Sequence, residues 1–375
     1  MSKLASATSA LLRSRTRRVM VGDVAIGGGA PVSVQSMTKT YTADVAATIA
    51  QIQRLQEAGC EIVRVAVPDQ EAAEALPRLV RQCKLPVVAD IHFDYRLAIA
   101  ALQAGVHKLR INPGNIGGAE RAKKVLREAK ERGVPVRIGV NAGSLEKDLY
   151  ERHGGAPPEA LVASALRQVE LCQDIGFDDI VLSLKASDVL TTIEAYRLIA
   201  RHVDFPLHLG ITEAGTRWTG TVKSAVGIGV LLAEGIGDTI RVSLAGDPVE
   251  EVRVGWEILK SLRLRKRGVT VIACPTCGRT EVDVAAIAEE LGRRLAAVDK
   301  ELTVAVMGCA VNGPGEAKEA DVGVACGKKA ALLFRRGTVV GKIREEEIVE
   351  RLLREVEEWP SVGHAGPTTS REEVL

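Results

Sequence analysis

The stretch VSVQSMTKTYTADVAATIAQIQRLQEAGCEIVRVAV, residues 32–67, decides the fold class of this chain. Two short runs rich in Val and Ile, at 32–37 and 61–67, enclose a segment of helical period from Asp44 to Ala58. Gly59 follows that segment directly, as a left-handed helix cap requires. Two apolar strands joined by one helix indicate a βαβ unit and therefore a parallel sheet.

The same unit recurs along the chain as far as residue 243. The predicted strands are Val32–Met37, Glu61–Val67, Pro86–Ile91, Lys108–Asn112, Pro135–Val140, Asp179–Leu184, Pro206–Ile211 and Asp238–Ser243. Eight such units in succession are typical of a TIM (β/α)8 barrel. A doubly wound open sheet is the alternative, although its first strand is usually followed by a Gly-rich turn, where this chain has Gln35-Ser36-Met37-Thr38.

A second, smaller α/β domain follows the barrel. Its predicted elements are strands at 269–273, 302–307, 321–325 and a strand pair around 332–340, with helices at 282–298 and 345–358. We therefore expect a disordered leader (1–15), the barrel (16–264), a basic connector (265–268), the small domain (269–358) and a flexible tail (359–375). Residues 19–26 read as a hairpin at the bottom of the barrel.

The composition excludes several classes of protein. The chain has 375 residues, with 50 basic and 48 acidic side chains, a net charge of +2 and 46% hydrophobic residues, which is typical of a soluble globular protein. This balance, with only 4 Phe, 4 Tyr and 3 Trp, argues against a nucleic-acid partner. No uncharged apolar run approaches the roughly 18 residues that span a membrane. The 7 Cys, without a secretion signal, favour a reducing, cytoplasmic location.

Basic side chains recur on the predicted barrel strands, at whose C-terminal ends barrel enzymes place their active sites. They are Arg64, Arg110, Arg137, Lys185 and Arg241. Asp90 and Glu213 supply only two carboxylates against them, so we expect an anionic ligand with more than one phosphate. Asn141 and Ser243 add amide and hydroxyl donors. A lattice of salt bridges across the barrel is the alternative.

Two carboxylates and two histidines are further candidates. Asp90 and Glu213 lie on the third and seventh strands, roughly across the barrel, where they could exchange protons with a ligand or bind its hydroxyl groups. His92 and His208 are weaker candidates, because a lone strand histidine is more often a hydrogen-bonded core residue than a catalyst.

The small domain carries the sharper signal, Cys274-Pro275-Thr276-Cys277. A CxxC pair alone fits zinc, a redox dithiol or half of an iron–sulfur site. Cys309 begins a Gly- and Pro-rich turn that reaches Glu316, and a second CxxC pair, usual in zinc ribbons, is missing. Cys326 could supply a fourth thiolate but lacks such a turn. Three cysteines with Glu316 would leave one iron an oxygen ligand or an open position.

Together these motifs resemble the 4-hydroxy-3-methylbut-2-enyl diphosphate synthase family. The matching segments are 35–38, 110–115, 208–215, 235–243, 274–279 and 312–316, in order, within residues 16–358. The chain is similar to the shorter, bacterial form of the family, in which the barrel joins the cluster domain directly. Nothing is carried over to the leader or the tail.

The resemblance implies an oxidoreductase of the non-mevalonate isoprenoid pathway. It would open the ring of 2-C-methyl-D-erythritol 2,4-cyclodiphosphate and reductively dehydrate it to the linear allylic diphosphate, with two electrons from flavodoxin or ferredoxin. The resemblance also implies a homodimer in which the cluster domain of one subunit covers the barrel of the other. This would solve the problem that a short connector poses for folding the cluster domain over its own barrel.

The resemblance further implies roles for individual residues. Those expected to hold a [4Fe-4S] cluster are Cys274, Cys277, Cys309 and Glu316. Those expected to bind the diphosphate are Arg64, Arg110, Arg137, Asn141, Lys185, Arg241 and Ser243. Asp90, Thr212 and Glu213 would face the carbon skeleton, Glu316 would yield its iron to the substrate oxygen, and Glu213 would assist proton delivery.

Two other functions remain open at this stage. A zinc-stabilised barrel hydrolase or aldolase would use Cys326 as the fourth zinc ligand and Lys185 as a Schiff-base lysine, and it would be colourless. A non-enzymatic protein that binds nucleic acid through residues 263–267 is the other, although such short basic runs usually face solvent.

Overall fold

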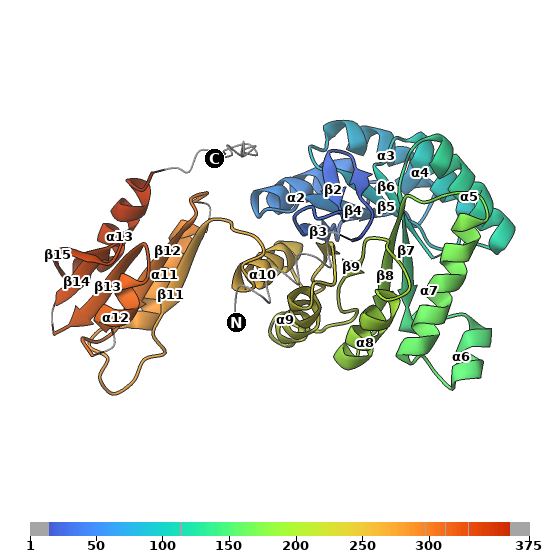
Figure 1. Ribbon diagram of the computed structural model, residues 1–375. Coiled ribbons are helices and arrows are strands. Elements are labelled where there is room, and N and C mark those ends of the chain that lie inside the picture. The colour runs from blue at the N-terminus through green and yellow to red at the C-terminus, as the bar shows by residue number, and fades with distance from the viewer. Residues whose placement is uncertain (1–14, 113–114, 297, 312, 329, 361–375) are drawn as a thin grey trace, which may run out of the picture. The chain divides into compact units, whose positions relative to one another are not determined.

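The computed structural model describes residues 15–360, except 113–114, 297, 312 and 329 (Figure 1). Most of the predicted leader (1–14) and tail (361–375) therefore lies outside the described residues, as do Pro113, Gly114 and Asn312 of the matching motifs. The chain divides into two compact units at the junction of Arg265 and Lys266.

Eight parallel strands close the first unit into a barrel (Figure 1). The strands are β3 (Ser33–Met37), β4 (Ile62–Ala66), β5 (Val87–Asp90), β6 (Lys108–Ile111), β7 (Val136–Asn141), β8 (Ile180–Lys185), β9 (His208–Leu209) and β10 (Thr239–Ile240). Their order is β8-β7-β6-β5-β4-β3-β10-β9, and a parallel bridge from Leu182 to Leu207 joins the two edges. The predicted TIM barrel is confirmed, and the open-sheet alternative is wrong.

Helices alternate with these strands. They are α2 (Val45–Glu57), α3 (Gln70–Gln82), α4 (Tyr95–Gln103), α5 (Ala119–Glu131), α6 (Lys147–His153), α7 (Pro158–Gln173), α8 (Val189–Ile199), α9 (Arg217–Ala233) and α10 (Pro248–Ser261). Aspartates cap several of them: the side chains of Asp44, Asp69 and Asp188 accept from backbone N–H groups of the first turn. These caps fix the loops that lead from the C-terminal strand ends into the helices.

Alternation along each strand separates an apolar layer from a polar interior. Val63 and Val65 of β4 belong to the large apolar core between strands and helices, and Arg64 lies between them in sequence. Successive strand residues point to opposite faces, so the Arg64 side chain is directed into the barrel. The apolar core between strands and helices therefore lies outside the barrel wall, and charged strand side chains such as Arg64 lie inside it.

A hairpin precedes the barrel, as predicted. It consists of β1 (Val19–Val21) and β2 (Val24–Ile26), paired antiparallel. The fully buried Val21 and Ile26 pack against Ile62 and Val88 of β4 and β5. The hairpin thus covers apolar side chains near the starts of these strands, away from the ends where the polar side chains gather.

The second unit is a five-stranded sheet covered on both faces. Its elements are β11 (Val269–Ala273), β12 (Leu302–Met307), β13 (Val322–Gly327), β14 (Ala330–Arg335), β15 (Thr338–Arg344), α11 (Val284–Leu295), α12 (Gly313–Lys318) and α13 (Ile348–Glu357). The strands β11, β12 and β13 are parallel, and β14 and β15 continue the sheet antiparallel. One apolar cluster joins the sheet to α11 and α13, and another joins it to α12.

Two expectations about element length are corrected. The seventh and eighth predicted strands, 206–211 and 238–243, shrink to the pairs His208–Leu209 and Thr239–Ile240. Gly210 approaches the carbonyl of Arg241 so closely that a Cβ there would lie 2.6 Å from that oxygen, and the chains turn into loops beyond this point. Thr212, Glu213 and Ser243 therefore belong to loops. Among the described residues, no helix has the length and apolar character needed to cross a membrane.

Candidate functional site

The predicted ligand-binding side chains gather at the C-terminal ends of the barrel strands. Asp90, Asn141 and Lys185 are the last residues of β5, β7 and β8. Arg64, Arg110 and Arg137 lie within β4, β6 and β7, and Arg241 follows β10 directly. The register pairs Arg110 with Arg137 and Asn141 with Lys185 across neighbouring strands. The barrel closure, which the sequence pattern predicts, is what brings these distant residues together.

Asp90 is the anion among these cations. Its carboxylate accepts a hydrogen bond from Arg110 Nη1 at 3.0 Å and lies 3.7 Å from Arg64 Nε, and His92 Nε2 is 3.6 Å away. Burial favours the neutral acid, but Arg64, His92 and Arg110 outweigh it and hold the pKa of Asp90 well below its usual range. One ionised carboxylate therefore orients two guanidinium groups.

The remaining cations are buried without enough anions. Arg137 is only 1% exposed, and its Nε and Nη1 have no hydrogen-bond partner among the described residues. Burial, with the neighbouring guanidinium groups, lowers the pKa of Arg137 and that of Lys185. Because a buried donor without a partner costs about 1–3 kcal/mol, these donors indicate a site built for an anion. A self-contained salt-bridge lattice does not account for them.

Two glycines make room for these side chains. A Cβ at position 139 would lie 2.7 Å from Arg110 Nε, and one at position 210 would lie 2.6 Å from Lys185 Nζ. A side chain at position 139 would therefore displace the Arg110 guanidinium group, and one at position 210 would displace the Lys185 ammonium group. At position 210 the Cβ would also meet the backbone carbonyl of Arg241 at 2.6 Å, so glycine is needed there.

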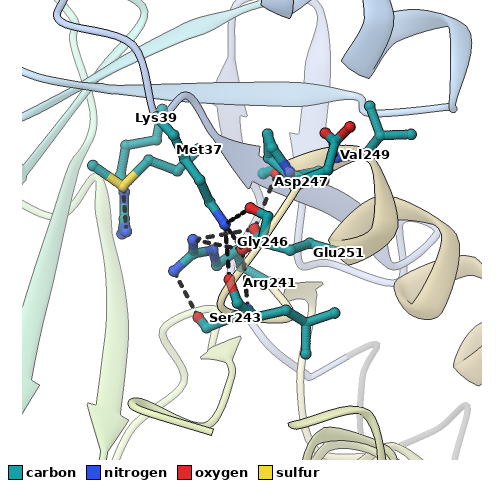
Figure 2. A network of polar contacts seen from close by, with 12 residues as sticks. Met37, Lys39, Arg241, Ser243, Gly246, Asp247, Val249 and Glu251 are labelled. Carbon is teal, nitrogen blue, oxygen red and sulfur yellow. Dashed lines mark hydrogen bonds and ion pairs between the residues drawn. The ribbon is translucent and has the colours of Figure 1, made fainter. Parts of the chain in front are cut away.

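A second carboxylate, Glu251 of α10, was missed by the sequence reasoning. Arg241 Nη2 donates to it at 3.1 Å, and Lys39 Nζ lies 3.3 Å from it (Figure 2). Arg241 also donates through Nη1 to Ser243 Oγ at 2.6 Å. The signal for Glu251 was an acidic residue on the buried stripe of α10, between Pro248 and Gly255, and nothing in the sequence paired it with Lys39.

Glu213, which was expected to assist proton delivery, lies at the rim of the barrel. Glu213 is exposed, with φ +51°, and with Arg241 and Ser243 it lines a pocket of about 430 Å³. The Thr212 N–H donates to the carbonyl of Ala186 at 3.3 Å, which ties this loop to the end of β8. Glu213 thus lies beside Arg241, whereas Asp90 forms ion pairs with Arg64 and Arg110.

The two histidines occupy different surroundings. His92 is half-exposed, and its Nε2 accepts from Arg110 Nη1 at 2.7 Å. His208 is fully buried, and neither ring nitrogen has a hydrogen-bond partner among the described residues. Burial and the cations Arg137, Lys185 and Lys108 lower the pKa of His208, so it stays neutral. Lys108, also fully buried, was not singled out from the sequence.

The predicted cluster ligands lie near one edge of the small sheet. Cys274 follows β11 directly, and Cys309 lies two residues beyond β12, its parallel neighbour. Cys277 is exposed in the loop after Cys274, and the exposed Glu316 lies on α12. Within the described part of the chain, no three His, Cys, Asp or Glu side chains are close enough together to hold a metal ion. The four predicted ligands therefore lie in the same region of the small unit, but their side chains are not close enough to share one metal ion.

The surroundings of Cys274 fit a cluster thiolate. The Gly308 N–H donates to its Sγ at 3.2 Å. A Cβ at position 308 would collide with Thr280 and Val284 at 2.7 and 2.6 Å, so only glycine brings the backbone this close to the sulfur. Thr276, between the two cysteines, has φ +52° and turns the loop back. Backbone N–H groups directed at sulfur are a known way to tune iron–sulfur sites.

The other cysteines differ in burial. Cys60, Cys172 and Cys326 are buried, and burial raises the pKa of each thiol to about 12. Cys326 belongs to the apolar cluster beneath α11 and α13. A thiol held in its neutral form by burial is a poor metal ligand. This argues against Cys326 as the fourth ligand of a zinc site.

Comparison with known proteins agrees with this arrangement. Residues 16–256 match the model of the GcpE TIM-barrel domain, and residues 270–358 match that of the GcpE protein C-terminal domain. The chain belongs to the GcpE family. The resemblance seen in the sequence motifs and the family's barrel architecture are thereby confirmed.

Named relatives of the GcpE family are close. The chain is 57% identical over 346 residues to 4-hydroxy-3-methylbut-2-en-1-yl diphosphate synthase (flavodoxin) of Geobacter sulfurreducens, covering 92% of this chain and 98% of the relative. It is 58% identical, with the same coverage, to the protein of that name from Caldanaerobacter subterraneus subsp. tengcongensis. A dihydropteroate synthase structure from Xanthomonas albilineans matches with a TM-score of 0.48 at 16% identity, over 66% of this chain and 97% of that one.

Proposed function

We propose that this chain catalyses the reaction after which its relatives are named. It converts 2-C-methyl-D-erythritol 2,4-cyclodiphosphate to (E)-4-hydroxy-3-methylbut-2-enyl diphosphate, a step of the non-mevalonate isoprenoid pathway. Two electrons and a proton enter and water leaves. The observation that carries the proposal is a set of buried guanidinium donors at the barrel end that have no hydrogen-bond partner among the described residues, which fits a diphosphate. The family match argues against a hydrolase, an aldolase or a nucleic-acid binder.

A [4Fe-4S] cluster is proposed as the cofactor, held by Cys274, Cys277 and Cys309, with Glu316 as an exchangeable oxygen ligand. When bound, such a cluster supplies single electrons to the substrate. The accessible thiols and the N–H group directed at Cys274 support this assignment. None of the seven cysteines forms a disulfide, which supports a reducing, cytoplasmic location.

The barrel residues bind and orient the substrate. Arg64, Arg110, Arg137, Asn141, Lys185, Arg241 and Ser243 are proposed to hold the diphosphate. Asp90 keeps Arg64 and Arg110 in place through its ion pairs. Glu213 is exposed beside Arg241 and Ser243, so it can exchange a proton with water and pass it to the substrate. Thr212 and Asp90 face the carbon skeleton in this proposal.

Flavodoxin is the proposed electron donor, because it is in the names of both relatives. Ferredoxin is the alternative. The test is steady-state turnover with each reduced donor at equal concentration. A higher kcat/KM with ferredoxin would overturn this assignment and leave the reaction unchanged.

The active unit is proposed to be a homodimer whose site combines the barrel of one subunit with the cluster domain of the other. The chain leaves the barrel at the starts of its strands. Arg265 donates to the carbonyl of Val32 at 2.8 Å and pairs with Glu61 at 3.0 Å, just before β3 and β4. The cation site lies at the opposite ends of the strands, which supports delivery of the cluster by a second copy.

Subunit mixing tests the shared site. Arg137→Ala and Cys309→Ser should each be inactive alone, and mixing them under exchange conditions should restore turnover, because one intact barrel then meets one intact cluster domain. No recovery, with exchange verified by mass, would rule out a shared site.

The function itself is tested on anaerobically purified protein. We expect about four irons and four sulfides per chain, an EPR signal of the reduced protein that changes on adding the cyclic diphosphate, and the linear product by mass spectrometry. Stoichiometric zinc in a colourless protein after attempted reconstitution would overturn the proposal that the chain is an iron–sulfur oxidoreductase.

A further inference from the structure

Glu251 is a buried carboxylate to which the reaction described above assigns no role. It lies in the first turn of α10, and its side chain is only 1% exposed. A carboxylate is rarely buried this completely unless it is paired. The hydrogen-bond partners of Glu251 should therefore indicate its role.

The hydrogen-bond partners of Glu251 lie in β3 and in the segment that follows β10, at the end of the barrel where the cations gather. Arg241 Nη2 donates to Oε2 at 3.1 Å and to Oε1 at 3.3 Å. The Leu244 N–H donates to Oε1 at 3.0 Å, and the Ser36 hydroxyl donates to Oε2 at 3.3 Å. The carboxylate thus joins the end of β3 to the loop after β10.

Lys39 completes the same network from the loop after β3 (Figure 2). Its Nζ lies 3.3 Å from Glu251 Oε1 and donates to the carbonyl of Leu244 at 2.7 Å and to that of Gly246. One ammonium group therefore ties two backbone carbonyls and the carboxylate together. The loop that carries Ser243, Leu244 and Gly246 is held at three points.

The network fixes a guanidinium group that lines the pocket. Arg241 donates through Nη2 to Glu251 and through Nη1 to Ser243. Arg241 and Ser243, together with Glu213, line the pocket of about 430 Å³. A charged side chain with several rotatable bonds loses entropy when an anion orders it. A partner that orders it in advance removes this cost from binding.

We propose that Glu251 is a positioning residue that sets Arg241 and, with Lys39, the loop 243–246 for binding a substrate phosphate. The proposal rests on the proposed function for the identity of the substrate. Glu251 does not touch the ligand and acts through Arg241. Its removal should therefore weaken phosphate binding and raise KM more than it lowers kcat.

The test compares Glu251→Gln with Glu257→Gln, a change of the same chemistry at an exposed position of α10, where Glu257 pairs with Lys260. Affinity for inorganic pyrophosphate is measured by calorimetry at fixed salt, and KM and kcat are measured with the cyclic diphosphate. We expect Glu251→Gln to weaken pyrophosphate binding about tenfold, as for loss of a charged hydrogen-bond partner, and Glu257→Gln to match the wild type. Wild-type affinity in Glu251→Gln would overturn the proposal.

A double-mutant cycle separates positioning from a general effect on folding. In an Arg241→Met background, Glu251→Gln should weaken pyrophosphate binding by clearly less than tenfold, because its route through Arg241 is gone and only its contact with the Leu244 N–H of the loop remains. The same tenfold loss in both backgrounds would mean that Glu251 does not act through Arg241. Pyrophosphate binding needs no turnover, so failure of the proposed reaction would not be mistaken for failure of this inference.

Lys39→Met keeps the test decisive if Glu251→Gln does not fold. It removes the tether of the loop 243–246 but leaves the Glu251–Arg241 pair. We expect KM for the cyclic diphosphate to rise about threefold to fivefold at nearly constant kcat, as for loss of uniform binding. An unchanged KM, with thermal unfolding like that of the wild type, would contradict the role given to Lys39.

Discussion

Both units of this protein carry their candidate site residues at the C-terminal ends of parallel strands, but the barrel buries these side chains and the small unit leaves them partly or fully exposed. In the barrel, Arg137 and Lys185 are buried inside a closed ring of strands. In the small unit, Cys277 is exposed, and Cys274 and Cys309 are partly exposed, beyond the ends of parallel strands in an open sheet. Both sets stand at C-terminal strand ends, where parallel sheets usually bind ligands.

The difference fits what each of the two proposed ligands requires. A diphosphate is held best by donors that are already ordered and shielded from water, which strengthens each charged hydrogen bond. An iron–sulfur site must admit electrons from another protein and must keep one position open for the substrate. A closed barrel provides the first setting and an open sheet edge the second. The predictions below test this contrast.

The largest effect on turnover is expected from the cysteines at the C-terminal strand ends of the small sheet, Cys274, Cys277 and Cys309. Cys309→Ser should abolish bound iron and lower turnover by more than roughly 100-fold, beyond the range seen for changes next to metal ligands. Pyrophosphate binding to the barrel should remain within twofold of wild type, because the phosphate site belongs to the other unit. Iron analysis, turnover and calorimetry check this.

Cys83→Ala is the matched control for the open edge. Cys83 is half-buried in the barrel unit, beyond α3, and takes no part in the proposed site. Iron content and activity should not change. If Cys309→Ser also kept its iron, the assignment of the small unit would fail.

The next effect is on barrel stability. Asp90→Asn should lower the free energy of unfolding by about 3–5 kcal/mol, because Arg64 and Arg110 would stay buried without their anion. Glu290→Gln breaks an exposed pair with Arg293 in the small unit and should cost less than about 1 kcal/mol. Urea unfolding, followed separately for each unit, measures both. Equal costs would remove the contrast between the units.

The pH dependence of Asp90 gives a smaller effect of known sign. The pKa of Asp90 is lower in the folded protein than in the unfolded chain, mainly because Arg64, His92 and Arg110 outweigh its burial. The stability it contributes is fully present above its unfolded pKa of about 3.9 and is lost as the pH falls below that value. In urea unfolding, the difference between wild type and Asp90→Asn should therefore begin to shrink as the pH falls below about 4 and keep shrinking toward lower pH. A constant difference would contradict the ion-paired state of Asp90.

The smallest effect is proton uptake on ligand binding. Burial and the neighbouring Arg137, Arg64, Arg241 and Arg110 lower the pKa of Lys185 in the ligand-free barrel. Two phosphate charges beside it should raise that pKa again, so binding should take up part of a proton at a pH between the lowered and the raised pKa. Calorimetry in two buffers of different ionisation enthalpy, with the cyclic diphosphate, detects this uptake.

Lys185→Arg is the control for proton uptake, since a guanidinium does not titrate in this range. The uptake should shrink in that variant. Uptake identical to that of the wild type would assign the proton to another group of the barrel, such as His208.

Much of the fold and part of the site could be predicted from local pattern. The strand β12 has the predicted bounds, and Gly59 has the positive φ predicted for the residue after its helix. The CxxC pair and the recurring arginines were visible because their residue types are unusual in their surroundings. Local signals fail where a partner is far away in sequence: the Glu251 carboxylate meets the hydroxyl of Ser36, 215 residues distant.

The sequence by itself determined the strand and helix order, the division into a barrel and a small sheet, and which residue types line the strand ends, because backbone periodicity and capping are local properties. Tertiary structure alone decided which of these side chains are buried, how Asp90 and Glu251 divide the cations between them, and that Glu213 stands at the rim. Those outcomes depend on barrel closure, which brings distant strands together and removes their polar groups from water.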